Sequence, residues 1–150
     1  MATYNGILNG TKIGVYDGST LLAYSTSGSI SINHNLRDAS NKSSGGWSES
    51  LEGQRDWEIS AEGLLAFLDA SGTAGGGSAI TGKTVDEMFT SYIATRSTLS
   101  IVFETTESGD YKYSGTAYLT SVSMEAPMED TSTWSMSFKG TGVLTQAVIP

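Results

Sequence analysis

The sequence predicts a mainly β protein in which two antiparallel sheets pack as a sandwich or partly closed barrel, with one flanking α-helix. Most of the chain alternates between apolar and small polar side chains, which is typical of strands that bury one face. Glycine and hydroxyl residues separate these stretches, and a single stretch has helical spacing. With 150 residues, the chain is expected to form one domain, residues 1–150.

Composition and charge exclude several classes of protein. The chain has 16 acidic and 8 basic residues, a formal net charge of −8, and no cysteine. Nucleic-acid binding needs clustered Lys and Arg and is not expected, whereas a surface that repels nucleic acid stays possible. Disulfides, thiolate metal sites and a Cys nucleophile are also excluded. Without a secretion signal or about 18 consecutive apolar residues, we expect a protein that is soluble when made, with no membrane insertion.

The first third of the chain contains three expected strands. Residues 13–15 and 21–24 flank a tight turn at Asp17-Gly18. Residues 29–36 alternate cleanly, so this strand is expected to bury one face only. The buried face would carry Ile30 and Ile32, and the polar face Ser29, Ser31 and Asn33.

Two long connections interrupt the strand pattern. Residues 37–53 form a polar, glycine-bearing loop, which is long for a structureless connection inside a compact domain. Such loops are usually functional or mobile. A second, flexible connection is expected at residues 71–83, around the run Gly75-Gly76-Gly77.

The strand after the long loop has one acidic face. Trp57, Ile59 and Ala61 alternate with polar residues and are expected to face the core. Carboxylates cannot form a core without partners, so the other face must meet water. That face carries Asp56, Glu58 and Glu62.

One helix is expected, starting at Thr84. Thr84 and Glu87 have the spacing of a capping box. An apolar stripe follows at helical spacing, and the helix should end near residues 94–96. The stripe consists of Val85, Met88, Phe89 and Tyr92.

Three more strands are expected, at residues 98–104, 111–124 and 133–140. The last has a single apolar face formed by Trp134, Met136 and Phe138. In the middle strand the apolar residues fall on both faces, so it is expected to be covered on both sides. Tyr118, Val122 and Met124 lie on one face, and Ala117 and Leu119 on the other.

No stretch predicts catalysis, a cofactor or a metal. His34 is the single histidine and has no nucleophile or ligand set at a recognised spacing. The acidic strand has the spacing of a glycosidase pair or cation site, about 6.6–7 Å, but any strand has it. The glycine runs lack the P-loop residues. Trp47 is the one candidate for an exposed aromatic side chain.

Three stretches, in chain order, resemble the major tail protein (tail tube protein) family of long-tailed bacteriophages. The first is residues 29–63, with the loop Asp-Ala-Ser-Asn-Lys-Ser-Ser-Gly-Gly-Trp at 38–47. The second is the helix at residues 84–96 after the glycine-rich connection. The third is residues 114–142, including Ser-Val-Ser-Met-Glu-Ala-Pro-Met-Glu-Asp at 121–130 and Trp-Ser-Met-Ser-Phe-Lys-Gly-Thr-Gly at 134–142.

The resemblance implies a structural subunit of a virion tail and not an enzyme. Members of the family form hexameric rings that stack into a hollow tube, whose lumen is lined by a barrel of joined sheets. Implied partners are further copies, the tape measure protein, and tail terminator and tip proteins. The genome passes through the tube into the host without specific binding, and assembly occurs in the host cytoplasm.

The resemblance also suggests roles for individual residues. The loop at 37–53 matches a loop that commonly reaches a neighbouring ring, and its candidate contact residues are Arg37, Asp38, Lys42, Trp47 and Glu49. DNA must slide without sticking, which favours an acidic wall without Lys or Arg. We therefore expect the lumen to be lined by Asp56, Glu58, Glu62, Ser29, Ser31 and Asn33, where no basic residue interrupts the acidic strand face.

Two other functions fit the sequence less well. A type VI secretion tube protein shares the fold and the ring habit of tail tube proteins. A carbohydrate-binding β-sandwich would need Trp47 or tyrosines arranged as an exposed platform.

Overall fold

The computed structural model describes residues 10–66, 82–105 and 107–150. The connection expected at 71–83 lies outside these residues up to position 81. Short 3₁₀ turns occur at Gly10–Lys12 and Lys42–Ser44, and a π-turn at Phe89–Ile93 continues the helix. The remaining elements are β1 (Gly14–Asp17), β2 (Thr20–Leu21), β3 (Ser25–Asp38), β4 (Ser50–Leu64), α1 (Val85–Met88), β5 (Thr98–Glu104), β6 (Tyr111–Glu125), β7 (Thr133–Gly140) and β8 (Thr145–Val148).

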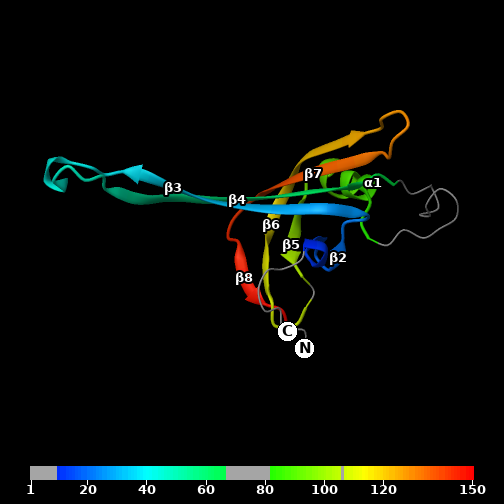
Figure 1. Cartoon of the computed structure of the whole chain (residues 1–150), viewed down its shortest axis with the longest axis horizontal. Coiled ribbons are helices and arrows are strands. Elements are labelled where there is room, and N and C mark those ends of the chain that lie inside the picture. Colours follow the sequence, from blue (N-terminus) through cyan, green and yellow to red (C-terminus); the bar gives the residue numbers. More distant parts are fainter. Residues whose placement is uncertain (1–9, 67–81, 106) are drawn as a thin grey trace.

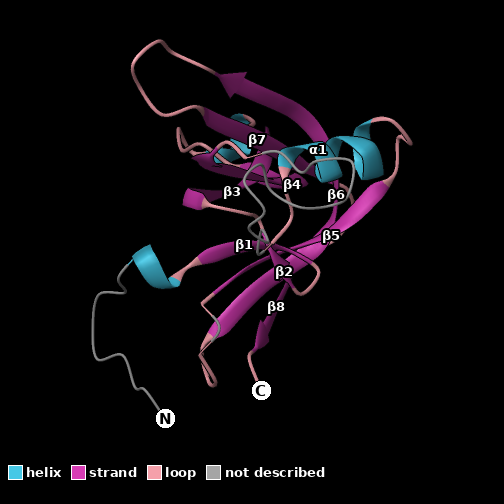
Figure 2. Ribbon diagram, turned by 90° about the vertical axis from the view of Figure 1, so that its right-hand side faces the viewer, coloured by secondary structure: helices cyan, strands magenta, loops and turns pink. Residues whose placement is uncertain are grey.

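The eight strands form one antiparallel sheet with the order β2-β1-β5-β6-β7-β4-β3, and β8 pairs with β6. The mainly β, antiparallel fold with one flanking helix is confirmed. The two expected layers are parts of one open sheet, because β6 belongs to both. Its first half pairs with β5 and β8, and its second half pairs with β7. Figure 2 shows the sheet turning along this strand, so that the two parts enclose the core.

A β-bulge explains the irregular pattern of β6. The register with β7 shifts between Leu119 and Ser121, so one extra residue enters the strand. Leu119 lies opposite Phe138, and Val122 lies opposite Met136 on the same face of the sheet. The expectation that β6 is covered on both sides was wrong, because a bulge moves every later side chain to the other face.

The core lies beneath β4 and β7. Ile59 and Phe138 are fully buried, and Trp57 is 3% exposed. The Trp57 ring lies directly on backbone, since a Cβ atom added at Gly140 would collide with its Cε2. Its Nε1 also donates a hydrogen bond of 3.2 Å to the Gly142 carbonyl. These contacts hold the middle of β4 in place.

Helix α1 packs against the sheet as expected, but it is short. The capping box is present, with the Thr84 backbone N–H donating to Glu87 Oε2 at 2.9 Å. After Met88 the chain changes to the π-turn, in which the Ala94 N–H bonds to the Phe89 carbonyl five residues back. The Tyr92 hydroxyl donates to Asp17 Oδ2 at 2.5 Å and ties this segment to β1.

Strands β3 and β4 extend beyond the body as a two-stranded hairpin, here called the arm (residues 33–56), which Figure 1 shows at the left. Pairing continues to Asp38 opposite Ser50, so the loop is residues 39–49 and not 37–53. The loop has its own hydrogen bonds: Ser43 N donates to Asn41 Oδ1 at 2.8 Å, and Glu49 N donates to the Ser40 hydroxyl at 2.9 Å.

Candidate functional site: the polar face and the arm

The polar face is the side of β3, β4, β7 and the second half of β6 that points away from the core. Antiparallel register aligns its side chains in rows across the strands. One row joins Ser29, Ser60 and Ser137, and the next joins Ser31, Glu58 and Lys139. The other side chains on this face are Ser27, Asn33, Asp56, Glu62, Tyr118, Ser121, Ser123, Glu125, Thr133 and Ser135.

All six residues expected to line a lumen lie together on this face. Asn33 is opposite Asp56, Ser31 is opposite Glu58, and Glu62 is opposite Ser27. Sequence reasoning missed the contribution of β6 and β7. The alternation that placed Trp134, Met136 and Phe138 on the apolar face already placed Ser135 and Ser137 on the other, but only the strand order puts them beside β4.

No basic residue interrupts the acidic face of β4 itself, but the neighbouring strand β7 brings one beside it. Lys139 lies opposite Glu58, and its Nζ is 3.2 Å from Asp56 Oδ2. Lys139 was not placed near β4 because the contact spans 83 residues of sequence. The face therefore has four carboxylates (Asp56, Glu58, Glu62 and Glu125) against one ammonium group, which leaves it acidic.

The Asp56 carboxyl has two stabilising neighbours. The Asn33 side chain, followed by Lys139, lowers the pKa of Asp56 below its ordinary value. Both members of the Asp56–Lys139 pair are about two-fifths or more exposed, so the ion pair contributes little to stability. Its main effect is to hold the Lys139 ammonium against the sheet.

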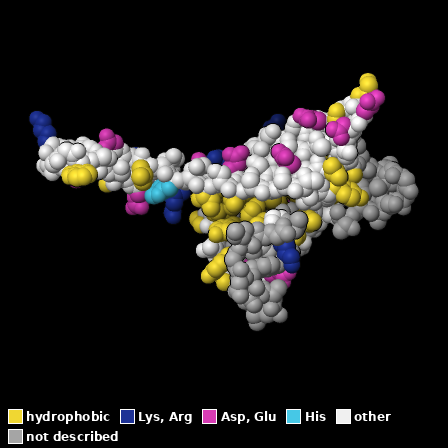
Figure 3. All heavy atoms as spheres, in the orientation of Figure 1, with side chains coloured by type: hydrophobic (Ala, Val, Ile, Leu, Met, Phe, Trp, Pro, Cys, Tyr) yellow, Lys and Arg dark blue, Asp and Glu magenta, His cyan; other side chains and the backbone are white. Residues whose placement is uncertain are grey.

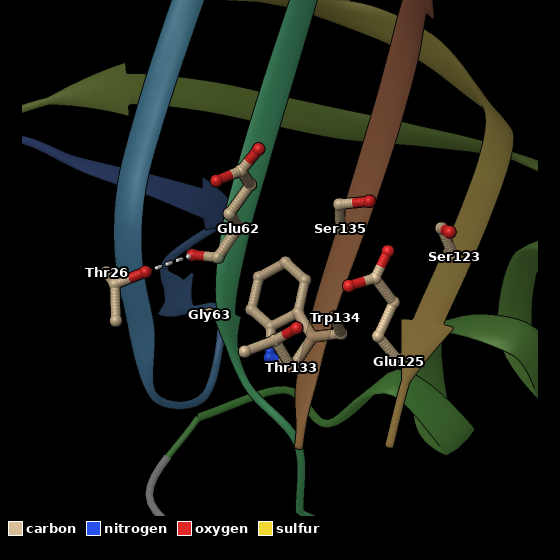
Figure 4. A pocket seen from close by; sticks show the side chains of 8 residues that line it. All are labelled: Thr26, Glu62, Gly63, Ser123, Glu125, Thr133, Trp134 and Ser135. Carbon is tan, nitrogen blue, oxygen red and sulfur yellow. Dashed lines mark hydrogen bonds between the residues drawn. The ribbon is translucent and has the colours of Figure 1, made fainter. Parts of the chain in front are cut away.

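A shallow hollow of about 210 Å³ lies at the end of the polar face near the β6–β7 turn. Figure 4 shows Glu62 and Glu125 on either side of Ser135, with the hydroxyls of Thr26 and Ser123 nearby. Trp134 lies beneath the strands and is 3% exposed. Carboxylates and hydroxyls thus meet the solvent here, while the apolar side chains are directed inward.

Among the described residues, the three tryptophans do not come together as the platform of a carbohydrate-binding module. Trp57 and Trp134 are buried in the core. Trp47 is 81% exposed in the loop that ends the arm, residues 39–49. His34 lies on the arm opposite Arg55. Within residues 10–66, 82–105 and 107–150 no group of His, Asp and Glu could hold a metal ion, and no helix there is long and apolar enough to cross a membrane.

The expected loop residues lie along the outer part of the arm. Arg37 and Asp38 end β3, Lys42 lies in the turn, and Glu49 bonds back to Ala39 through its carbonyl. The expectation that Ile32 is buried was wrong: its side chain is 56% exposed, because it lies on β3, the last strand of the sheet, just before the arm. The arm itself exposes two large aliphatic side chains that sequence reasoning did not single out, Leu36 and Leu51, each more than half exposed. Their presence in a polar stretch was the signal that could have found them.

Two strand edges border the polar face and carry no partner strand among the described residues. One is β3, the last strand of the sheet, and the other is the second half of β6. Strand β5 pairs with β6 only as far as Tyr118, so residues 119–125 have β7 on one side alone. Unpaired edges readily pair with another chain.

An antiparallel sheet with one acidic, hydroxyl-rich face, two open edges and a projecting arm defines a structural subunit built for assembly. Residues 12–146 match the sequence model of the phage tail tube protein family. The chain belongs to this family, and it is a structural subunit of a tail tube.

Two solved structures are similar to this chain in fold. One is a chain of the virion of a native gene transfer agent particle, with a TM-score of 0.72 and 20% identity. The other is a chain of the tail of an empty gene transfer agent particle with C6 symmetry, with a TM-score of 0.71 and 21% identity. Each match covers 95% of this chain and 100% of the other. A search of curated proteins found no match.

Proposed function

We propose that six copies of this chain form a ring in which β3 of one copy pairs with the open half of β6 of the next. The observation that carries this is the position of the two open edges, one on each side of the polar face. Repeating one heterologous contact around a symmetry axis closes a ring. The C6 symmetry of the similar gene transfer agent tail supports the number six.

In such a ring the polar face lines the lumen. The four-stranded part of the sheet from each copy would join the next into a continuous wall, with the apolar core behind it. Acidic and hydroxyl side chains repel phosphate or bond to it weakly, so a genome can move along the wall. The single Lys139 of each copy is paired with Asp56 and is surrounded by carboxylates.

Stacked rings then form the tube that conducts the genome into the host. The tape measure protein would occupy the lumen during assembly, and terminator and tip proteins would close the ends. We place the assembled chain in the virion tail, built in the host cytoplasm. The family match favours this function over a type VI secretion tube.

Electron microscopy of the purified protein tests the assembly. Hollow rods or six-fold rings are the expected particles. Solid fibrils, or a closed dimer at every concentration, would contradict a tube.

Thiol labelling tests which face lines the lumen, and the absence of native cysteine makes the result clean. Ser60→Cys on the polar face should react with a bulky polymer maleimide in the free subunit and be protected in intact tubes. Ser108→Cys, on an exposed turn away from that face, is the control. Equal labelling of Ser60→Cys in tubes and in subunits would place the polar face outside.

A further inference from the structure

Lys139 is the one basic residue on the polar face, and all eight Lys and Arg residues lie in the described part of the chain. Figure 3 shows most acidic side chains of the body along its upper side, above the apolar side chains. The basic residues that lie outside the polar face are Lys12, Arg37, Lys42, Arg55, Lys83, Arg96 and Lys112. Each copy therefore brings a single ammonium group to this surface.

The ammonium group of Lys139 is directed toward Asp56. In the strand register Lys139 lies between Glu58 on β4 and Tyr118 on β6. Its Nζ lies 3.2 Å from Asp56 Oδ2, although Asp56 comes two residues before Glu58 in β4. The lysine side chain is therefore directed diagonally along the sheet. It stays 46% exposed, so an anion in the solvent can compete with Asp56 for it.

Strand β3 in turn supports Asp56. Asn33 lies directly opposite Asp56 in the β3–β4 register. The Asn33 side chain, followed by Lys139, lowers the pKa of Asp56, so this carboxylate stays ionised near neutral pH. The exposed ion pair contributes little to stability. It does fix the position of the one positive charge on the polar face.

An ammonium group on an acidic wall has two opposite effects on a passing nucleic acid. It offsets the mutual repulsion of the carboxylates gathered on one face. It also binds phosphate, because each lysine that neutralises a phosphate adds a contact and releases counterions. A lysine ammonium is a compact point charge with three hydrogen-bond donors, which a carboxylate or a phosphate can accept. If that ammonium were free in every copy, the contact would repeat along a tube and hinder movement.

We propose that Asp56 is a positioning residue that keeps the Lys139 ammonium away from the phosphates of the passing genome. This rests on the proposed function, in which the polar face lines the lumen. Asp56 binds the ammonium from within the sheet, so the lysine reduces repulsion among the carboxylates without holding DNA.

Retention of DNA by assembled tubes tests the shielding. Tubes of the unsubstituted chain, of Asp56→Asn and of Glu62→Gln are filled with a labelled DNA duplex and washed at increasing salt. Glu62→Gln is the matched control, because it removes one negative charge from the same face and strand, and Glu62 lies opposite Ser27 and Ser135. We expect Asp56→Asn to retain clearly more DNA than Glu62→Gln at low salt. Between about 50 and 200 mM salt, Asp56→Asn should lose at least about threefold more of its binding, the loss expected for one added phosphate contact.

A second substitution shows whether the retained DNA is held by the lysine. Asp56→Asn/Lys139→Gln should release DNA as freely as the unsubstituted tubes, and Lys139→Gln alone should not increase retention. Asp56→Glu, which keeps a carboxylate beside the lysine, should retain less DNA than Asp56→Asn. Equal retention and equal salt dependence of Asp56→Asn and Glu62→Gln would show that only the total charge matters, and the shielding would be wrong.

Labelling of Lys139 in the free subunit separates this proposal from the proposed function. An amine-reactive reagent, read out by peptide mass, should modify Lys139 severalfold faster in Asp56→Asn than in the unsubstituted chain or in Glu62→Gln. Equal rates in all three proteins would overturn the shielding and leave the tube function standing. If Asp56→Asn does speed labelling but Ser60→Cys reacts equally in tubes and subunits, the polar face is not the lumen. Both proposals would then fail.

Discussion

The polar face and the arm are made from the same two strands, yet they present opposite surfaces. In the body, β3 and β4 turn Ile59 and Trp57 into the core and carry acids and hydroxyls on the opposite face. In the arm neither face is covered, and Leu36, Leu51 and Trp47 are left exposed. One pair of strands thus provides a surface suited to sliding and a surface suited to binding, because the core underlies only part of its length.

Trp57 in β4 and Trp47 in the arm loop allow the sharpest test of this contrast. Trp57→Ala should lower the free energy of unfolding by about 3–5 kcal/mol, since a large buried ring is lost and a cavity remains. Chemical denaturation of the free subunit measures the change. A loss below about 1 kcal/mol would show that Trp57 does not hold β4 in place.

Trp47→Ala should have the reverse effect. Stability of the free subunit should change by less than about 0.5 kcal/mol, because the side chain is already exposed. The concentration needed for tube formation should rise tenfold or more, which corresponds to about 1.4 kcal/mol for each contact. Sedimentation and electron microscopy across a concentration series measure this. Unchanged assembly would mean that the arm tip is not a contact.

Neutralising the acids of the polar face should change how freely DNA moves through the tube and should not change how the subunit folds. We expect tubes of Asp56→Asn/Glu58→Gln/Glu62→Gln to retain labelled DNA, with retention falling as salt is raised. The unsubstituted tubes should release it freely. Glu52→Gln/Glu104→Gln/Glu107→Gln, with the same loss of charge away from the face, is the control. Equal retention by both triple variants would remove the special role of the polar face.

The Asp56–Lys139 pair should give the smallest effect. Because the folded-state pKa of Asp56 is lowered, its contribution to stability is present above the unfolded pKa and is lost as pH falls through the folded value. Thermal unfolding between pH 2 and pH 7 should therefore show a slightly weaker acid dependence for Asp56→Asn. If the unfolding temperature falls equally with decreasing pH in both proteins, the pair contributes nothing to the acid dependence of stability.

Many of the strand faces of this protein could be predicted from the alternation of apolar and polar residues along the chain. The apolar faces of residues 57–61 and 134–138, the exposed acids of β4 and the helix start at Thr84 all follow from local spacing and capping. The six candidate residues of the polar face could be grouped because a strand has only two sides. Prediction failed where the backbone departs from regular geometry, as at the bulge after Leu119 and the π-turn at Phe89.

The sequence by itself determined the family and which side chains avoid water. Tertiary structure alone decided the neighbours: Lys139 beside Asp56, the serines of β7 beside β4, and an apolar groove between α1 and β6 at the end opposite Trp47. The reason is that the alternation of apolar and polar residues indicates which face of a strand is buried. Strand order, bulges and open edges depend instead on pairing between segments far apart in the chain.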